Sequence, residues 1–137
     1  MRFMMLMYPG PKAESGAMPD EKIIAQMMKY NEDLAKSGVL LALDGLHPSS
    51  KGARVKFNAG KPTVIDGPFT ESKEIVGGYW IIQVKSREEA IEWAKRAPCP
   101  EGETIELRQI FDVADFGGDV AKVEEDFAKR MAENARR

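Results

Sequence analysis

Three side chains that could transfer protons follow predicted strands: Asp44, His47 and Asp66. An imidazole titrates near neutral pH, and a carboxylate three residues away can orient it or stabilise its charge. His47 is therefore a candidate general acid or base, with Asp44 as its partner. Asp66 is a carboxylate held at a tight turn, where a pocket could use it as a base or an anchor. All three are predicted as catalytic residues.

Each of these residues also has a simpler interpretation. A histidine between a strand and a loop is commonly a surface residue, which applies to His47. An aspartate in a turn commonly accepts hydrogen bonds from nearby backbone, which for Asp66 means the amide of Phe69 or Thr70. The turn around Asp66 would then shape the molecule without contacting a ligand.

A metal centre is not predicted. His47 is the only histidine and Cys99 the only cysteine, so one chain can form neither a histidine pair nor a cysteine-based zinc motif. A site of Asp44, His47 and Asp66 completed by a second chain is an alternative, but no metal-ligand spacing recurs. Cys99 lies between two prolines without a basic neighbour in sequence, which favours a structural role. We expect no cofactor.

A polar, glycine-rich and aromatic stretch surrounds Asp66. It runs Asp-Gly-Pro-Phe-Thr-Glu-Ser-Lys-Glu over 66–74, and Gly-Gly-Tyr-Trp follows at 77–80. Glycine and proline predict a rigid turn that feeds a strand. One of the two rings of Tyr79 and Trp80 is expected in the core, and Tyr79 is expected to line a pocket. The predicted ligand-binding residues are Gly67, Pro68, Phe69, Lys73, Glu74 and Tyr79.

The charged side chains of this stretch allow another interpretation. Two acids, Glu71 and Glu74, flank Lys73, and such a run is usually a solvated loop. The same acids would raise the pKa of the Lys73 amine, which argues against a catalytic amine there.

Apolar periodicity and turn residues predict the elements that position these groups. The first two strands are short runs of large apolar residues, which favours burial of both faces. A serine at the cap followed by a glutamate three residues on predicts that the second helix starts at Arg87. The predicted order is a strand over 2–8, a helix over 19–37, a strand over 39–43, a hairpin with strands over 53–57 and 62–65, a strand over 79–84, a helix over 87–97, and a strand over 104–111.

A further helix is predicted from Val120 to about Ala135. It carries Val123, Phe127 and Met131 on an otherwise charged surface. This narrow apolar stripe predicts packing on its own domain or on a partner subunit. Membrane binding is disfavoured because the polar face carries both signs of charge.

The fold class that follows is α+β. The order strand, helix, strand, strand, helix, strand is the ferredoxin-like βαββαβ plan, here with a hairpin inserted after the second strand and an extra C-terminal helix. Helices that cover one face of such a sheet leave the other face without cover. Two sheets packed face to face would cover it, which predicts a homodimer.

Composition limits the function classes. The chain has 137 residues, 43% apolar and 31% charged, with a net charge of −2, which suits one globular domain. Interspersed charges argue against nucleic-acid and membrane partners. The apolar start is too short to span a bilayer and shows no secretory cleavage pattern, so a cytoplasmic location is expected. G-x-S-x-G, P-loop, G-x-G-x-x-G and H-E-x-x-H motifs are missing, which disfavours the large enzyme classes that use them.

The motif Asp-Gly-Pro-Phe at 66–69 is the signature of the DGPF group of YCII-related proteins, and the chain resembles that family from Arg2 to about Phe116. The strongest stretches are 38–47, 66–80 and 86–97. The resemblance implies a domain over 1–116 with a helical extension over 117–137. It also implies a dimeric α+β barrel, in which two sheets enclose a shared barrel with pockets near the interface.

The resemblance does not supply catalytic residues. Smaller relatives are thought to pair a histidine in the first helix with an aspartate after the second helix, but the corresponding positions here are Met27 and Ala97. The wider superfamily includes lactone isomerases, a dehydrochlorinase and cofactor-free monooxygenases. It implies a small-molecule ligand and acid-base chemistry rebuilt from Asp44, His47 and Asp66. The alternative is a non-catalytic accessory protein, because some DGPF proteins are associated with alternative sigma factors.

Overall fold

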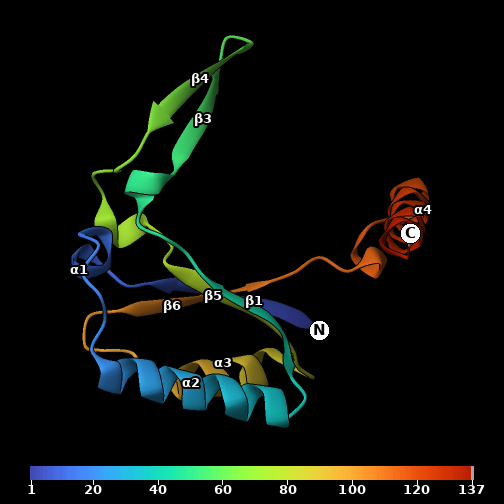
Figure 1. Cartoon of the computed structure of the whole chain (residues 1–137). Helices are drawn as coiled ribbons and strands as arrows, with labels where there is room; N and C mark the ends of the chain where they lie inside the picture. Colours follow the sequence, from blue (N-terminus) through green and yellow to red (C-terminus); the bar gives the residue numbers. More distant parts are fainter. Residues whose placement is uncertain (137) are drawn as a thin grey trace.

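A four-stranded antiparallel sheet forms the centre of the molecule, for which the computed structural model describes residues 1–136 (Figure 1). The strands lie in the order β2-β5-β1-β6, which is the ferredoxin-like order. They are β1 (Arg2–Tyr8), β2 (Leu40–Gly45), β5 (Gly78–Gln83) and β6 (Thr104–Gln109). The helices α2 (Glu21–Lys36) and α3 (Arg87–Lys95) cover one face of this sheet (Figure 1).

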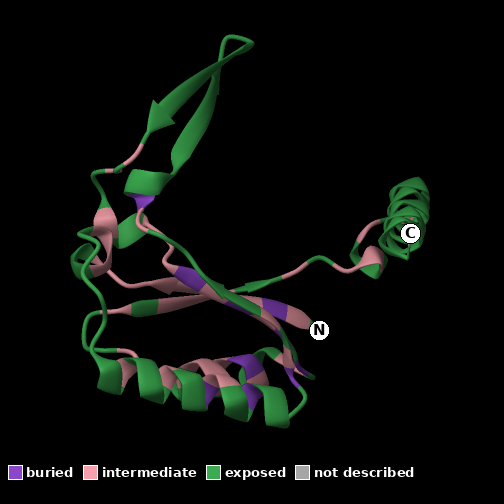
Figure 2. Cartoon of the chain, viewed as in Figure 1, coloured by how far each residue is buried: buried purple, intermediate pink, exposed green. Residues whose placement is uncertain are grey.

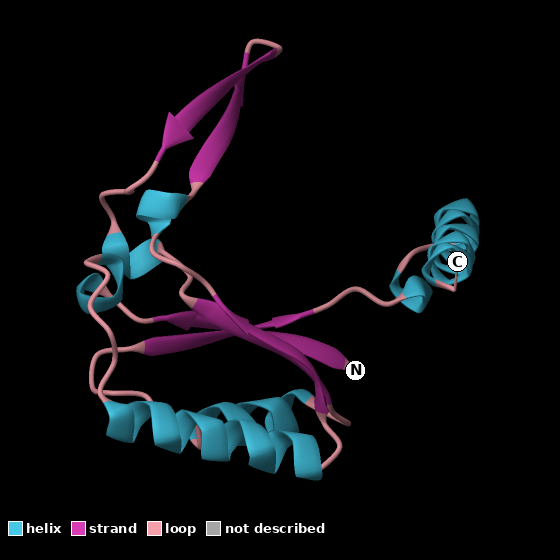
Figure 3. Cartoon of the chain, in the orientation of Figure 1, coloured by secondary structure: helices cyan, strands magenta, loops and turns pink. Residues whose placement is uncertain are grey.

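The remaining elements lie outside this two-layer body (Figure 3). A separate hairpin of β3 (Ala53–Asn58) and β4 (Lys61–Asp66) projects from one end of the sheet, and α4 (Gly118–Ala135) follows an extended segment at the other end. The short helices are α1 (Pro11–Glu14), η1 (Ser49–Lys51), η2 (Ser72–Glu74) and η3 (Val113–Asp115). The α+β, ferredoxin-like prediction with an inserted hairpin and an extra helix is confirmed.

The core lies between the sheet and the two helices (Figure 2). Trp80 packs edge-on against Tyr30 with ring centroids 5.8 Å apart, and its indole N–H donates to Asn31 Oδ1 at 2.8 Å. The buried hydrophobic residues are Phe3, Met5, Tyr30, Leu34, Val39, Trp80, Ile82, Val84 and Ala90. As predicted, one ring of the Tyr79-Trp80 pair enters the core, and it is Trp80.

Both predicted helices of the body are present, and α3 starts at Arg87 as predicted, but α2 starts two residues later than predicted, and the helices end one and two residues earlier than predicted. Asp20 accepts a hydrogen bond from the Lys22 amide at 3.1 Å, and Gly38 follows α2 with φ 82°. Ser86 accepts from the Glu89 amide at 3.1 Å. In a capping box the glutamate accepts a hydrogen bond from the amide of the cap residue, here Ser86. Glu89 Oε2 instead accepts from the amide of Lys85, one residue earlier, at 2.8 Å.

The prediction that the first two strands are buried on both faces was wrong. In β1, Phe3 and Met5 are buried toward the helices, whereas Met4 and Leu6 on the other face are only half-buried. β2 is an edge strand, and its Leu41 is 49% exposed. The sheet therefore has a second face that no helix of the described chain covers, and we call it the open face. No helix within residues 1–136 is long and apolar enough to cross a membrane.

Candidate functional site

The open face carries a row of residues that the strand register places side by side. Asp44 pairs with Tyr79, Tyr79 with Leu6, and Leu6 with Glu106. Strands lie about 4.8 Å apart, so Asp44 and Glu106 at the two ends of the row are about 14 Å apart. The two carboxylates are too distant to share a proton, but a small molecule between them could contact both.

Asp44 and Tyr79 form the only side-chain hydrogen bond across this row in the described chain. The Tyr79 hydroxyl donates to Asp44 Oδ2 at 2.8 Å. This hydrogen bond to a carboxylate holds the phenolic proton and raises the pKa of Tyr79. The predicted partner of Asp44 was His47, and the structure pairs Asp44 with Tyr79.

A recess of about 280 Å³ lies at the end of the open face beside η2. Two of its lining residues, Lys73 and Glu74, were predicted as ligand-binding residues. The others come from the strand ends, and sequence reasoning missed them: Tyr8, Thr104 and Glu106. The alternation of side chains along the two strands could have indicated them, because Tyr8 faces away from the buried Phe3 and Met5, and Thr104 and Glu106 alternate with Ile105 and Leu107, which pack against the core.

His47 and Asp66 are both exposed. No hydrogen bond or ion pair joins either of them to Asp44 within the described residues. Backbone bonds nevertheless bring His47 to the recess end of the sheet: the Leu46 amide donates to Gly77 O at 2.9 Å, and the Gly77 amide donates to Met7 O at 2.7 Å. His47 therefore lies at the same end of the sheet as Tyr8 and η2.

The turn at 66–69 is held by Ser49. The Phe69 amide donates to Ser49 Oγ at 3.0 Å, so this amide bonds Ser49 and not Asp66 as the simpler interpretation expected. Ser49 is buried, and its amide and hydroxyl both donate to the Glu14 carboxylate. A Cβ at Gly67 would lie 1.7 Å from Ser49 O. Gly67 and Phe69 therefore fix the base of the hairpin, whatever else they contact.

Phe69 has a second structural contact. The Arg54 guanidinium carbon lies 3.8 Å from the centroid of the Phe69 ring. This cation–π contact links β3 to the turn that follows β4. Pro68 is exposed beside it.

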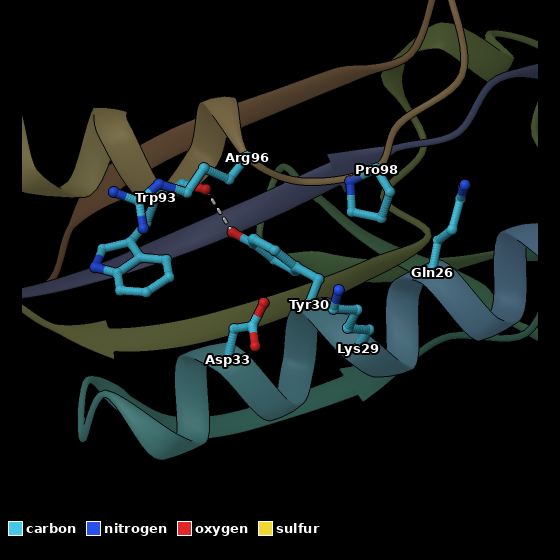
Figure 4. Close-up of a pocket in the computed structure, with 7 residues that line it drawn as sticks. All are labelled: Gln26, Lys29, Tyr30, Asp33, Trp93, Arg96 and Pro98. Carbon is cyan, nitrogen blue, oxygen red and sulfur yellow. Dashed lines mark hydrogen bonds between the residues drawn. The ribbon is translucent and has the colours of Figure 1, made fainter.

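A second hollow, of about 350 Å³, lies on the outer surface between α2 and α3 (Figure 4). In its middle, the Tyr30 hydroxyl donates to Trp93 O at 2.7 Å, and Arg96 lies 4.5 Å from the Trp93 ring centroid. Burial raises the pKa of Tyr30 to about 12. One hydrogen bond, from Tyr30 to Trp93 O, thus joins the two helices across this hollow, and none of the predicted site residues lines it.

Cys99 is half-buried, with its sulfur 3.7 Å from the sulfur of Met7. Burial, and to a smaller degree the charge of Glu103, raises the pKa of the Cys99 thiol to about 11. Such a thiol is a poor nucleophile at neutral pH. Within residues 1–136, no three His, Cys, Asp or Glu side chains gather closely enough to hold a metal ion.

Comparison with known proteins decides the family. Residues 1–114 match the model of the YCII-related domain. The chain belongs to the YCII-related family. The predicted family is therefore confirmed, and the match includes the open face, the recess and the turn at 66–69, while α4 follows the matched region.

Two curated relatives of this YCII-related chain match only part of their own length. An uncharacterised protein of Rhizobium meliloti is 30% identical over 76 residues, which cover 56% of this chain and 61% of that protein. A Clostridium kluyveri protein with the provisional name competence-damage inducible protein is 31% identical over 124 residues, which cover 88% of this chain and 28% of that protein. Neither match carries an activity over to this chain.

One similar solved structure is 5-chloro-2-hydroxyhydroquinone dehydrochlorinase from Burkholderia phenoliruptrix in complex with 2,5-dihydroxybenzoquinone. It is 15% identical to this chain, with a TM-score of 0.44, and the match covers 82% of this chain and 96% of that one.

Proposed function

We propose that this protein binds a small polar or aromatic molecule on the open face of its sheet, in a space that a second copy closes. The recess beside η2 is the observation that supports this most. It places an ammonium group, two carboxylates and two hydroxyls around one opening of about 280 Å³. This volume is close to the lower limit of pockets that hold drug-sized ligands.

The groups around the recess favour a ligand with both an apolar body and hydrogen-bonding groups. Lys73 supplies a cationic donor, and Glu74 and Glu106 supply anionic acceptors. The neighbouring row adds the apolar side chain of Leu6 next to Glu106. A phenol or a small hydroxylated ring would match this alternation, with its ring over Leu6 and its polar groups at either end.

Acid-base chemistry on such a ligand would use Asp44. The Asp44 carboxylate accepts a hydrogen bond from the Tyr79 hydroxyl. This bond positions the carboxylate at the opposite end of the row from Glu106. Asp44 is a base candidate and Tyr79 its positioning partner. His47 lies at the recess end of the sheet and remains the candidate for transfer to solvent, while Asp66 is an anchor candidate at the base of the hairpin.

A homodimer would close the site. Met4, Leu6 and Ile81 lie next to one another across β1 and β5 on the open face, and each is only half-buried in one chain. Packing them on a second copy would remove apolar surface from water, which stabilises association by about 25 cal/mol per Å² of buried area. The site would then lie between two sheets in a cytoplasmic dimer.

Thermal-shift screening with small phenols, lactones and hydroxylated acids tests the binding proposal. A ligand at a hundred times its Kd adds about 2.7 kcal/mol to the free energy of unfolding. We expect hits whose stabilisation is lost in Glu106→Gln and Lys73→Met, with reduced turnover or proton exchange in Asp44→Asn. Glu92→Gln is the control, because Glu92 lies on α3, away from the open face.

The proposal fails if hits stabilise the Glu106 and Lys73 variants as strongly as the unmodified protein. Loss of the shift in the Glu92 control would also contradict it, since binding would then depend on the helical layer.

A further inference from the structure

The hollow between α2 and α3 is larger than the recess on the open face. It holds about 350 Å³ and lies on the helical layer (Figure 4). This volume falls within the range of pockets that hold small molecules. The hollow and the recess share no lining residue. A molecule bound between the helices would therefore leave the recess free.

Contacts between the two helices fix the floor of this hollow. Tyr30 in α2 is buried, and its hydroxyl donates to Trp93 O in α3 at 2.7 Å. The Arg96 guanidinium carbon lies 4.5 Å from the centroid of the Trp93 ring. A guanidinium that lies over an aromatic ring keeps its N–H groups at its edge, where they can donate two parallel hydrogen bonds to a carboxylate. Arg96 is therefore already positioned for an anionic group.

Three charged side chains line the hollow: Lys29, Asp33 and Arg96. No ion pair within the described residues involves any of them. Asp33 and the Arg96 guanidinium lie at the Trp93 end of the hollow, and Lys29 lies on the other side of Tyr30 (Figure 4). Lys29 and Asp33 are about one helical turn apart, which is about 6 Å along the axis. The hollow thus offers two cations and one carboxylate that no other charged side chain of the described chain neutralises.

These charges favour a ligand with the opposite pattern. A carboxylate complements Arg96, and an ammonium group complements Asp33. An α-amino acid carries both groups on one carbon atom, so its head group can contact both side chains at the Trp93 end. A short acidic side chain would then extend along α2 toward Lys29.

We propose that the hollow between α2 and α3 binds an α-amino acid with an acidic side chain. Its α-carboxylate pairs with Arg96, its ammonium group with Asp33 and its side-chain carboxylate with Lys29. A dicarboxylate without the amine leaves Asp33 beside two anionic groups, so the site discriminates against it. The site lies within one chain, which makes it independent of the proposed ligand site and of a second copy.

An NMR titration of the ¹⁵N-labelled full chain with L-glutamate tests this site. We expect saturable changes in amide chemical shift that gather in 26–33 and 93–97. Glutarate has the same two carboxylates without the amine, and we expect it to bind about tenfold more weakly because it loses a hydrogen bond between charged groups. Equal Kd values for the two compounds, changes that gather on the open face, or no saturable change would each overturn the inference.

Arg96→Met tests the predicted carboxylate contact. The variant should bind L-glutamate about tenfold or more weakly, because it loses the charged hydrogen bonds of the guanidinium. Arg87→Met is the matched control, since it makes the same change in net charge on α3 and Arg87 does not line the hollow. An equal loss of affinity in both variants would mean that net charge alone attracts the ligand, which would contradict a site.

Asp33→Asn tests the predicted ammonium contact. The Kd values of L-glutamate and glutarate should become similar, because an amide neither attracts the ammonium group nor repels the second anion. Glu32→Gln is the control and should keep the preference for L-glutamate, since Glu32 does not line the hollow. A preference that survives in Asp33→Asn would refute the pairing with Asp33.

Folding and the second site are checked separately. The side chains replaced in these variants are exposed, so their thermal unfolding should match that of the unmodified protein. Lys73→Met at the recess should leave the affinity for L-glutamate unchanged. A loss of affinity in Lys73→Met would assign the amino acid to the recess and overturn the inference.

Discussion

The body of the molecule and its two arms differ in where their apolar side chains find contacts. In the body, Met5, Leu34 and Ile82 are fully buried between the sheet and the helices (Figure 2). In the hairpin every residue from 53 to 66 is exposed, and in α4 every residue except Ala121. The body therefore derives its stability from its own chain, whereas the arms keep apolar faces that only another surface can cover.

Truncation of a core residue should show the largest effect. Ile82→Ala is expected to lower the free energy of unfolding by about 2–5 kcal/mol, because Ile82 is fully buried and the truncation leaves a cavity. Urea denaturation followed by circular dichroism measures the change. Val123→Ala in α4 is the comparison and should change the value by less than about 0.5 kcal/mol in dilute monomer, since Val123 is 66% exposed.

The difference between body and arms would be refuted by similar losses for Ile82→Ala and Val123→Ala in dilute monomer. The Val123→Ala variant could instead lose stability only at concentrations where dimers form. That result would sharpen the comparison, because it would show that Val123 contacts a second copy.

The sequence predicted most of the body. Apolar periodicity along the strands and helices and the serine cap before Arg87 are local signals, so the elements could be located from neighbouring residues alone. Burial of the strands could not be predicted in the same way. An apolar run such as Arg2–Tyr8 looks the same whether helices cover both faces of a strand or one, and only the assembled sheet decides that.

The site was less predictable because its members come from distant segments. Lys73 and Glu74 were found from the charged turn, but Tyr8, Thr104 and Glu106 join them only through the pairing of β1 with β6. The hydrogen bonds through which Ser49 holds the 66–69 turn were not predicted either. Glu14 and Ser49 are 35 residues apart in sequence, and neither has a motif that predicts their hydrogen bonds.

The junction between arm and body offers the next largest effect. Gly67→Ala is expected to lower the free energy of unfolding by about 1–3 kcal/mol, because the new Cβ would lie 1.7 Å from Ser49 O and the backbone must move. The same urea experiment measures it. Limited proteolysis between 53 and 66 should also become faster as the hairpin loosens.

Gly45→Ala is the control for this substitution. Gly45 ends β2 on the body, and a Cβ there would meet no atom within 4 Å. Equal stability of the Gly67 and Gly45 variants would show that the turn does not depend on its close approach to Ser49.

A smaller change in the free energy of unfolding should come from the packed helix pair. Its dependence on pH should distinguish the helix pair from the arms. Tyr30 in α2 donates its hydroxyl to Trp93 O in α3, and burial raises its pKa from 10.0 to about 12. The proton is thus held more tightly in the folded state than in the unfolded state. The resulting stabilisation is fully present below pH 10 and is lost as the pH rises toward 12.

Tyr30→Phe tests this sign. At pH 8 the variant should be less stable by about 0.5–1.5 kcal/mol, the usual loss for one hydrogen bond. Between pH 10 and 12 the unmodified protein should lose stability faster than the variant, so the gap in the free energy of unfolding should narrow. A gap that stays constant to pH 12 would mean that the phenolic proton contributes nothing to packing of α2 on α3. Because no tyrosine lies in the hairpin or in α4, such a pH dependence would be a property of the body alone.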